Sequence, residues 1–78
     1  RIEFAHAIQL SDDSYAVGHS IGDLKAGNTH MIIVALKRGD VETEEPDDTI
    51  ILQKQDTLIV RGKPRRVELT ERYIQEGN

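Results

Sequence analysis

The sequence has no cysteine among its 78 residues, which excludes disulfide bonds, thiolate metal sites and cysteine nucleophiles. It also has no apolar run near the ~20 residues that a membrane-spanning helix needs, and no signal-peptide pattern. Internal repeats and low-complexity segments are absent. The net charge of -4 argues against binding to duplex nucleic acid, because such binding depends on neutralising phosphates.

The length indicates one small domain, since a chain of this size buries only about 60% of its unfolded surface. Its hydrophobic content of 37% and modest charge are typical of a folded chain. The sequence starts with Arg1, and a strand pattern follows almost at once. We therefore expect residues 1–78 to form a single domain excised from a longer chain. Its small core gives modest stability, which contact with a second copy would increase.

Four stretches predict β-strands. Apolar residues alternate over residues 2–10, which predicts a half-buried first strand with Phe4 and His6 on its apolar face. The unbroken run 31–36 predicts a central strand buried on both faces. A weak, acidic edge strand is expected at 41–43, and a closing strand at 56–62, where Leu58 and Val60 point one way and Ile59 the other.

Two helices are predicted around these strands. Ser20 is placed to cap a helix of one or two turns, which buries Ile21 and Leu24 and ends at residues 27–28. Pro64 marks the first position of an amphipathic C-terminal helix that runs to about residue 75. Because the short helix joins two strands as a crossover, we expect an α+β fold with a small mixed β-sheet of about four strands.

Residues 18–22 match the G-x-S-x-G pattern of hydrolase nucleophile elbows, with Ser20 at the serine position. An elbow needs a strong strand before it, a long helix after it, and an Asp and a His supplied by a much larger sheet. The chain is too short for that scaffold, so we expect no catalytic residue and no enzyme activity. The glycines are better explained as turn and close-packing positions.

The acidic segment 40–48 raises the question of a divalent cation. Alternating acids on a strand point to opposite faces, and the EF-hand pattern fails because Ile51 occupies the position twelve along from Asp40. A solvated strand edge explains the segment better, and we expect no metal and no cofactor.

Basic residues cluster near the predicted ends of the two strongest strands and the start of the last helix. The cluster comprises Lys37, Arg38, Arg61, Lys63, Arg65 and Arg66. If the two strand ends lie side by side, these residues form an anion-binding corner. The alternative is salt bridging to the acidic segment, and the sequence leaves both open.

Four segments in order resemble the TrkA C-terminal domain, the C-terminal half of the regulator of potassium conductance (RCK) module. They are Glu3-Phe4, the "VGHSIGDL" turn at 17–24, the "IVALKRG" strand at 33–39, and the "DTLIVRG" strand at 56–62. Gln55 departs from the family pattern, which often has glycine before this aspartate. The resemblance covers nearly the whole chain.

The resemblance implies a regulatory cytoplasmic domain of a potassium or cation transport protein, on the cytoplasmic side of the cell membrane. The ending Gly62-Lys63-Pro64 is similar to the tails of monovalent cation/proton antiporters. Such domains commonly form homodimers, act on the membrane transport domain of the parent protein and catalyse nothing. Some bind a nucleotide, cyclic di-AMP, and by position the ligand-binding residues here are Lys25, Asn28 and His30. The alternative is a ligand-free protein-interaction module.

Overall fold

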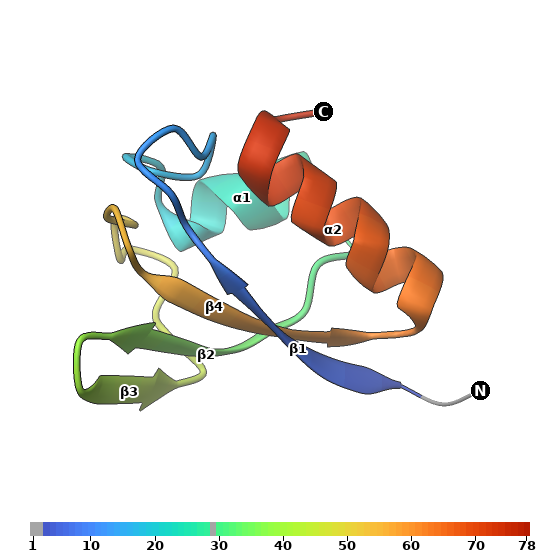
Figure 1. Cartoon of the computed structure of the whole chain (residues 1–78), viewed down its shortest axis with the longest axis horizontal. Coiled ribbons are helices and arrows are strands. Elements are labelled where there is room, and N and C mark those ends of the chain that lie inside the picture. The colour runs from blue at the N-terminus through green and yellow to red at the C-terminus, as the bar shows by residue number, and fades with distance from the viewer. Residues whose placement is uncertain (1–2, 29) are drawn as a thin grey trace.

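The computed structural model describes residues 3–28 and 30–78, and its elements follow the predicted order along the chain (Figure 1). Ile2, expected in the first strand, lies outside these residues. The elements are β1 (Phe4–Gln9), α1 (Ile21–Gly27), β2 (Ile33–Arg38), β3 (Val41–Glu44), β4 (Thr57–Gly62) and α2 (Pro64–Glu76). The α+β fold class is confirmed, and no helix within the described ranges could span a membrane.

The four strands form one sheet in the order β1-β4-β2-β3, and all three neighbouring pairs are antiparallel. The prediction of a mixed sheet was wrong in this respect. The crossover through α1 does give β1 and β2 the same direction, but β4 lies between them and runs the opposite way. A connection of this length can pass over one strand, and the local sequence does not reveal which strand it passes.

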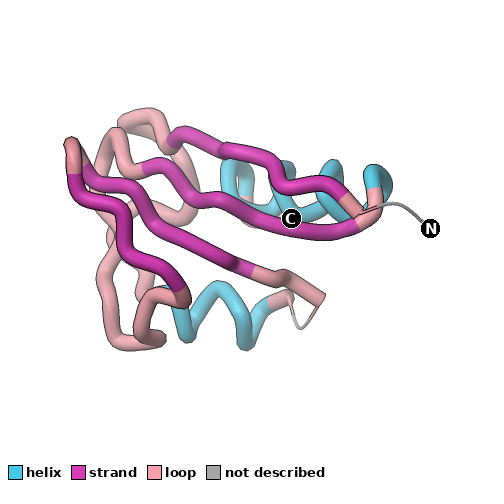
Figure 2. The backbone as a smooth tube through the Cα atoms, turned by 90° about the horizontal axis from the view of Figure 1, so that it is seen from below, coloured by secondary structure: helices cyan, strands magenta, loops and turns pink. Residues whose placement is uncertain are grey.

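Both helices lie on one side of the sheet, and Figure 2 looks onto the side that neither helix covers. The helix side holds the core, which includes Ile8, Leu24, Leu36, Leu58, Val60 and Ile74. The prediction that the run 31–36 is buried on both faces holds only in part, because Ala35 and Leu36 point to opposite faces and are both buried, whereas the start of the run is not buried throughout. Strand β2 is central, because it pairs with both β4 and β3, but Ile32 just before it is 41% exposed.

The short helix α1 forms as predicted. The Ser20 hydroxyl accepts a hydrogen bond from the Asp23 N–H at 3.0 Å, which satisfies one of the free amides of the first turn. Ile21 and Leu24 are fully buried. The helix ends at Gly27, where a Cβ would overlap the hydroxyl of Tyr73 on α2, so only glycine lets the two helices approach this closely.

Helix α2 also starts and ends where predicted, with Pro64 in its first turn and Gly77 as a left-handed cap at φ 84°. Thr70 and Ile74 are buried against the sheet. At the start of β1 the structure differs from the prediction, because Phe4 is 49% exposed and His6 is also exposed. Strand β1 is an edge strand, and little besides the first turns of α2 lies near its start.

Candidate functional site

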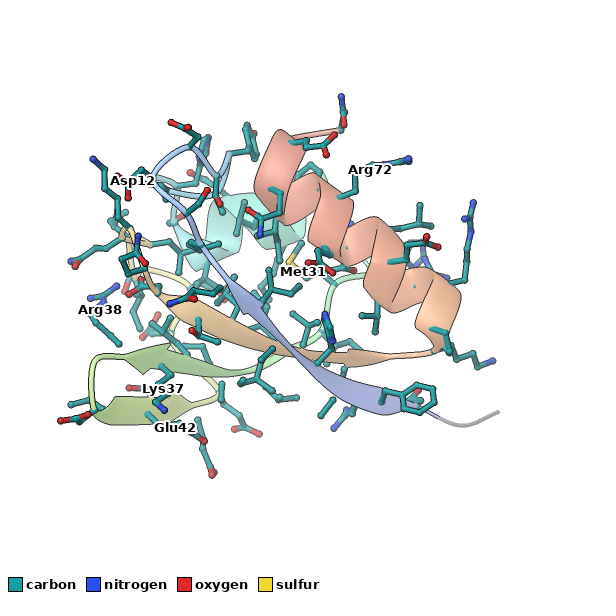
Figure 3. All side chains as sticks on the ribbon, viewed as in Figure 1. Asp12, Met31, Lys37, Arg38, Glu42 and Arg72 are labelled. Atoms are coloured by element: carbon teal, nitrogen blue, oxygen red, sulfur yellow. The ribbon has the colours of Figure 1, made fainter. Side chains whose placement is uncertain are left out.

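The predicted ligand-binding residues lie at the end of α1 and in the loop before β2. Asn28 shapes this loop. Its backbone N–H donates to Leu24 O at 3.0 Å and closes α1, and its side-chain Oδ1 accepts a bond from the His30 N–H at 3.2 Å. Its carbonyl accepts from the Met31 N–H at 3.1 Å, and Met31 itself is buried between α2 and the sheet (Figure 3). Asn28 therefore sets the backbone positions of His30 and Met31.

Lys25 is held to the segment that follows Pro46. Its Nζ lies 2.7 Å from Asp48 Oδ1, with side-chain exposures of 44% and 62%. The Gly22 N–H also donates to Asp48 O at 2.9 Å, so α1 and this segment are joined twice. A surface ion pair of this kind contributes only ~0–1 kcal/mol, so Lys25 can exchange Asp48 for a ligand at little cost.

His30 lies in a different place, on a hollow of about 270 Å³ at the junction of β4 and α2. The hollow is lined by Glu3, His30, Ile32, Gly62, Lys63 and Arg66. The ion pairs of the described residues include neither Lys63 nor Arg66. Three basic side chains, one from the loop before β2 and two from the start of α2, thus line one hollow, and its one carboxylate, Glu3, is paired with Arg61. This arrangement favours an anionic ligand group.

The structure therefore brings His30 together with Lys63 and Arg66, and it does not place Lys25 on the same hollow. The sequence prediction missed this grouping. His30 and Lys63 come together because β2 pairs with β4, and at the end of this pairing the Arg61 N–H donates to Ile32 O at 3.0 Å. That register sets the loop before β2 beside the residues after β4.

The same register shows that the prediction of a single basic corner was wrong. Because β2 and β4 are antiparallel, their carboxyl ends lie at opposite ends of the sheet. Lys37 is opposite Thr57, at the start of β4, whereas Arg61 lies beside the start of β2. Salt bridging accounts for three of the six basic residues, but with partners outside the acidic segment, in the pairs Arg38–Asp56, Arg61–Glu3 and Arg65–Glu68.

The Arg38–Asp56 pair is a structural contact. Arg38 Nε and Nη2 donate to Asp56 Oδ1 and Oδ2 at 2.9 and 2.8 Å, and Nη2 also reaches Ile51 O at 3.0 Å. Asp56 is 1% exposed and accepts a further bond from the Gln53 N–H at 2.8 Å. Burial raises the pKa of the Asp56 carboxyl, but the bonds from Arg38 and Gln53 outweigh it and leave the pKa below its ordinary value.

The serine of the G-x-S-x-G pattern acts in local structure. Ser20 caps α1, and Nδ1 of the neighbouring His19 lies 2.9 Å from the carbonyl oxygen of Tyr15.

Along β3, all residues of Val41–Glu44 are exposed, as a solvated edge requires. Within residues 3–28 and 30–78, no three potential metal ligands among His, Asp and Glu converge.

A larger hollow, of about 740 Å³, is an open, mostly apolar groove between β1 and α2, lined by residues that include Phe4, His6, Pro64 and Val67. It contains none of the predicted ligand-binding residues. Size alone does not identify a ligand site, and the smaller basic hollow has the convergent polar groups that a specific site needs.

Comparison with known proteins gives a family and a fold. The model of the TrkA-C domain family matches residues 5–75. No curated protein is similar enough to this chain to be matched.

Solved structures with the same fold include chains of two proteins, BusR and KtrA. The RCK_C domain dimer of S. agalactiae BusR in complex with c-di-AMP has a TM-score of 0.73 and 22% identity, over 90% of this chain and 86% of that one. BusR in complex with its busAB-promotor DNA also matches at 22% identity, and this chain covers 34% of it. The RCK C domain of the potassium transport protein KtrA, in complex with c-di-AMP, has a TM-score of 0.70 and 28% identity, over 90% and 84% of the two chains.

Proposed function

Because this chain belongs to the TrkA-C domain family, we propose that it is a regulatory domain of a potassium or cation transport protein that forms a homodimer and binds cyclic di-AMP. The transport protein would be a cation/proton antiporter or a potassium uptake system, with this domain on the cytoplasmic side of the cell membrane. The ligand would act by preferring one arrangement of the dimer, and it could shift the transport gate only by its differential affinity for the two states.

The observation that carries the proposal is the basic hollow. His30, Lys63 and Arg66 offer two permanent positive charges and an imidazole to a phosphate, and Ile32 offers an apolar surface to a base. Asn28 and Lys25, which precede His30 on the chain, complete the proposed set of ligand-binding residues. The similarity to the KtrA domain supports this choice of ligand, because that domain is solved with c-di-AMP.

The size of the hollow supports a dimer as well. A pocket for a drug-sized ligand has a volume of ~300–1,000 Å³, whereas this hollow has about 270 Å³. One copy can therefore hold only part of a dinucleotide. A two-fold symmetric ligand with two phosphates fits two copies of the same half-site.

Thermal unfolding with and without cyclic di-AMP tests the proposal. A ligand at ~100 times its dissociation constant stabilises the folded state by ~2.7 kcal/mol, which raises the melting temperature of a domain this size by roughly 10–20 °C. Lys63→Glu should remove most of that shift. Lys54→Glu, the same charge change in the turn before β4, should leave it intact. The proposal fails if millimolar cyclic di-AMP produces no shift in the unaltered chain.

The ligand-free interaction module remains the second candidate, and the Lys25–Asp48 pair is the observation in its favour. An ion pair of 2.7 Å already satisfies the charge of Lys25 within one copy. This candidate predicts a dimer whose melting temperature no nucleotide or cation changes, so the same titration separates the two.

A further inference from the structure

The two edges of the sheet differ in how they are protected against pairing with a further strand. Strand β3 is four residues long and contains Glu42 and Glu44. Strand β1 is six residues long and contains no lysine, no proline and no carboxylate. Short length and charge are the usual protection of an edge strand, because an unpaired edge can bind any extended chain. The edge at β1 lacks both kinds of protection.

The register of β1 shows which of its backbone groups point outward. Leu10 continues the pairing of β1 with β4, and its N–H donates to Asp56 O at 2.7 Å. Bonded and non-bonded pairs alternate along an antiparallel ladder. The N–H and C=O groups of Ala5 and Ala7 therefore point away from β4, and both alanines are exposed.

Helix α2 closes this edge only at its far end. The Gln9 carbonyl, which also points outward, accepts a hydrogen bond from Gln75 Nε2 at 3.2 Å. No side chain in the described part of the chain makes such a bond to the backbone of Ala5 or Ala7. These two residues form what we call the free edge, and an extended chain is the partner that satisfies donors and acceptors spaced in this way.

The open groove of about 740 Å³ runs beside the free edge, between β1 and α2 (Figure 1). Phe4 and His6 alternate with the two alanines along β1, and both line this groove. Pro64 and Val67 add to its apolar lining, and Phe4 is 49% exposed. A strand added to the free edge therefore places every second side chain in the groove.

The charges in the groove favour a basic side chain. Glu68 and Glu71 share the lining with one guanidinium, that of Arg65, which lies 3.5 Å from Glu68. Glu71 Oε1 lies 3.3 Å from His6 Nε2, and this imidazole is charged only when it is protonated. Two carboxylates thus face one permanent positive charge, so a lysine or arginine complements this part of the groove.

We propose that the free edge of β1 binds an extended segment of another protein, which adds a strand to the sheet. The segment places an apolar residue against Phe4 and Val67 and, two positions along, a basic residue beside Glu71. The main-chain bonds to Ala5 and Ala7 supply affinity, and the groove supplies specificity. This surface shares no lining residue with the basic hollow, so it goes beyond the proposed nucleotide binding.

A second copy of the chain is a poorer occupant of this edge. If two copies paired through β1, each would bring only the side chains of residues 4–9 to the groove of the other. These residues include no lysine and no arginine, so the carboxylates of the groove would gain no permanent positive charge.

Titration with a peptide, followed by two-dimensional proton–nitrogen NMR, tests this surface. The probe is Thr-Val-Thr-Lys-Thr-Val-Thr, in which a valine lies two positions from the lysine on either side, so it fits the groove in both directions along β1. We expect a dissociation constant below ~1 mM. The amide signals of Ala5, Ala7 and Glu71 should shift, and those of β3 should not.

Methylated peptides test the backbone bonds without altering the protein. Only one alternate set of amides in an added strand faces its neighbour. N-methylation of that set should abolish binding, whereas N-methylation of the other set should change the dissociation constant by less than ~3-fold. Equal binding of the two methylated peptides would overturn the proposal, because it would show that no strand is added.

Variants of the chain test the position of the peptide. Ala7→Pro removes an N–H that points outward, so it keeps the ladder with β4 and should weaken peptide binding at least tenfold. Glu71→Lys should weaken it at least fivefold. Glu76→Lys, the same charge change on α2 outside the groove, is the matched control and should have no effect. Circular dichroism checks the fold of each variant, and the methylated peptides keep the test valid if Ala7→Pro does not fold.

Three outcomes separate this surface from its alternatives. No shift of any amide at millimolar peptide would overturn the proposal. Self-association that Ala7→Pro abolishes, without peptide binding, would overturn it in favour of a second copy. Lys63→Glu, which alters only the basic hollow, should leave peptide binding unchanged, so a failure of nucleotide binding and a failure of this surface are distinguishable.

Discussion

Replacing Arg38 with methionine tests whether the buried carboxylate of Asp56 depends on this one guanidinium. The substitution keeps most of the side-chain length and removes two charge-assisted bonds of 2.9 and 2.8 Å, leaving Asp56 with the Gln53 amide alone. Breaking a buried pair by removing one partner costs ~3–5 kcal/mol, and the 40% exposure of Arg38 places this case at the lower end. We expect a loss of ~3 kcal/mol at pH 7, or roughly 12–24 °C in melting temperature.

The pH dependence of this loss makes the test sharper. In the unaltered chain the pKa of Asp56 is below its ordinary value, so its stabilising contribution is complete above pH ~4 and is lost as the pH falls through the folded-state pKa. Without Arg38, burial dominates and raises the pKa of the Asp56 carboxyl. Acidification then protonates this carboxyl and removes the cost of burying its charge in the variant. The difference in unfolding free energy between the two chains should therefore shrink from pH 7 to pH 3.

Urea unfolding followed by circular dichroism, at one protein concentration and at both pH values, measures this difference. Fixing the concentration removes the contribution of dimerisation to stability. Arg65→Met is the control, because its pair with Glu68 is 3.5 Å long and more than 70% exposed on both sides, and it should cost less than ~0.5 kcal/mol. A loss below ~1 kcal/mol for Arg38→Met, or a loss that does not change with pH, would refute the reasoning.

Three further changes probe α1, which contains Lys25 and leads into the loop before β2. Gly27→Ala should lower the free energy of unfolding in urea by ~1–3 kcal/mol, because its Cβ overlaps the Tyr73 hydroxyl. Adding Tyr73→Phe to the same chain should recover part of that loss. Equal stability of the single and double variants would contradict the packing argument. Ser20→Ala should lower stability by ~1 kcal/mol through loss of the helix cap, whereas an unchanged urea midpoint would show that the cap is dispensable. Lys25→Ala should leave the melting temperature nearly unchanged without ligand, because its pair with Asp48 is exposed, and should reduce the shift with cyclic di-AMP; a full shift would remove Lys25 from the site.

Local features of this chain could be predicted because they depend on neighbouring residues. The Ser20 cap, the Pro64 start of α2 and the end of α2 near residue 75 each follow from the local sequence, and the structure confirms all three. These features require no knowledge of which segments meet in space.

Features that depend on strand order could not be predicted in this way. Placing β4 between β1 and β2 changes the sheet from mixed to antiparallel, separates Lys37 from Arg61, and sets His30 beside Lys63. The exposure of Phe4 has the same origin, because an apolar residue on an edge strand is buried only where another layer covers it. A single sequence contains the pattern of each strand but not the order of pairing.

The position of β4 also bears on how the chain reaches its native state. Strands β1 and β2 have no ladder in common, and each is joined to the sheet through residues 57–62, near the end of the chain. Until that segment is available, only the β2–β3 hairpin can form, and an isolated hairpin is marginally stable in water. Such non-local pairing slows folding, since a long loop must close before its contacts form. During synthesis, the strands that precede β4 must therefore wait for it before the sheet can assemble.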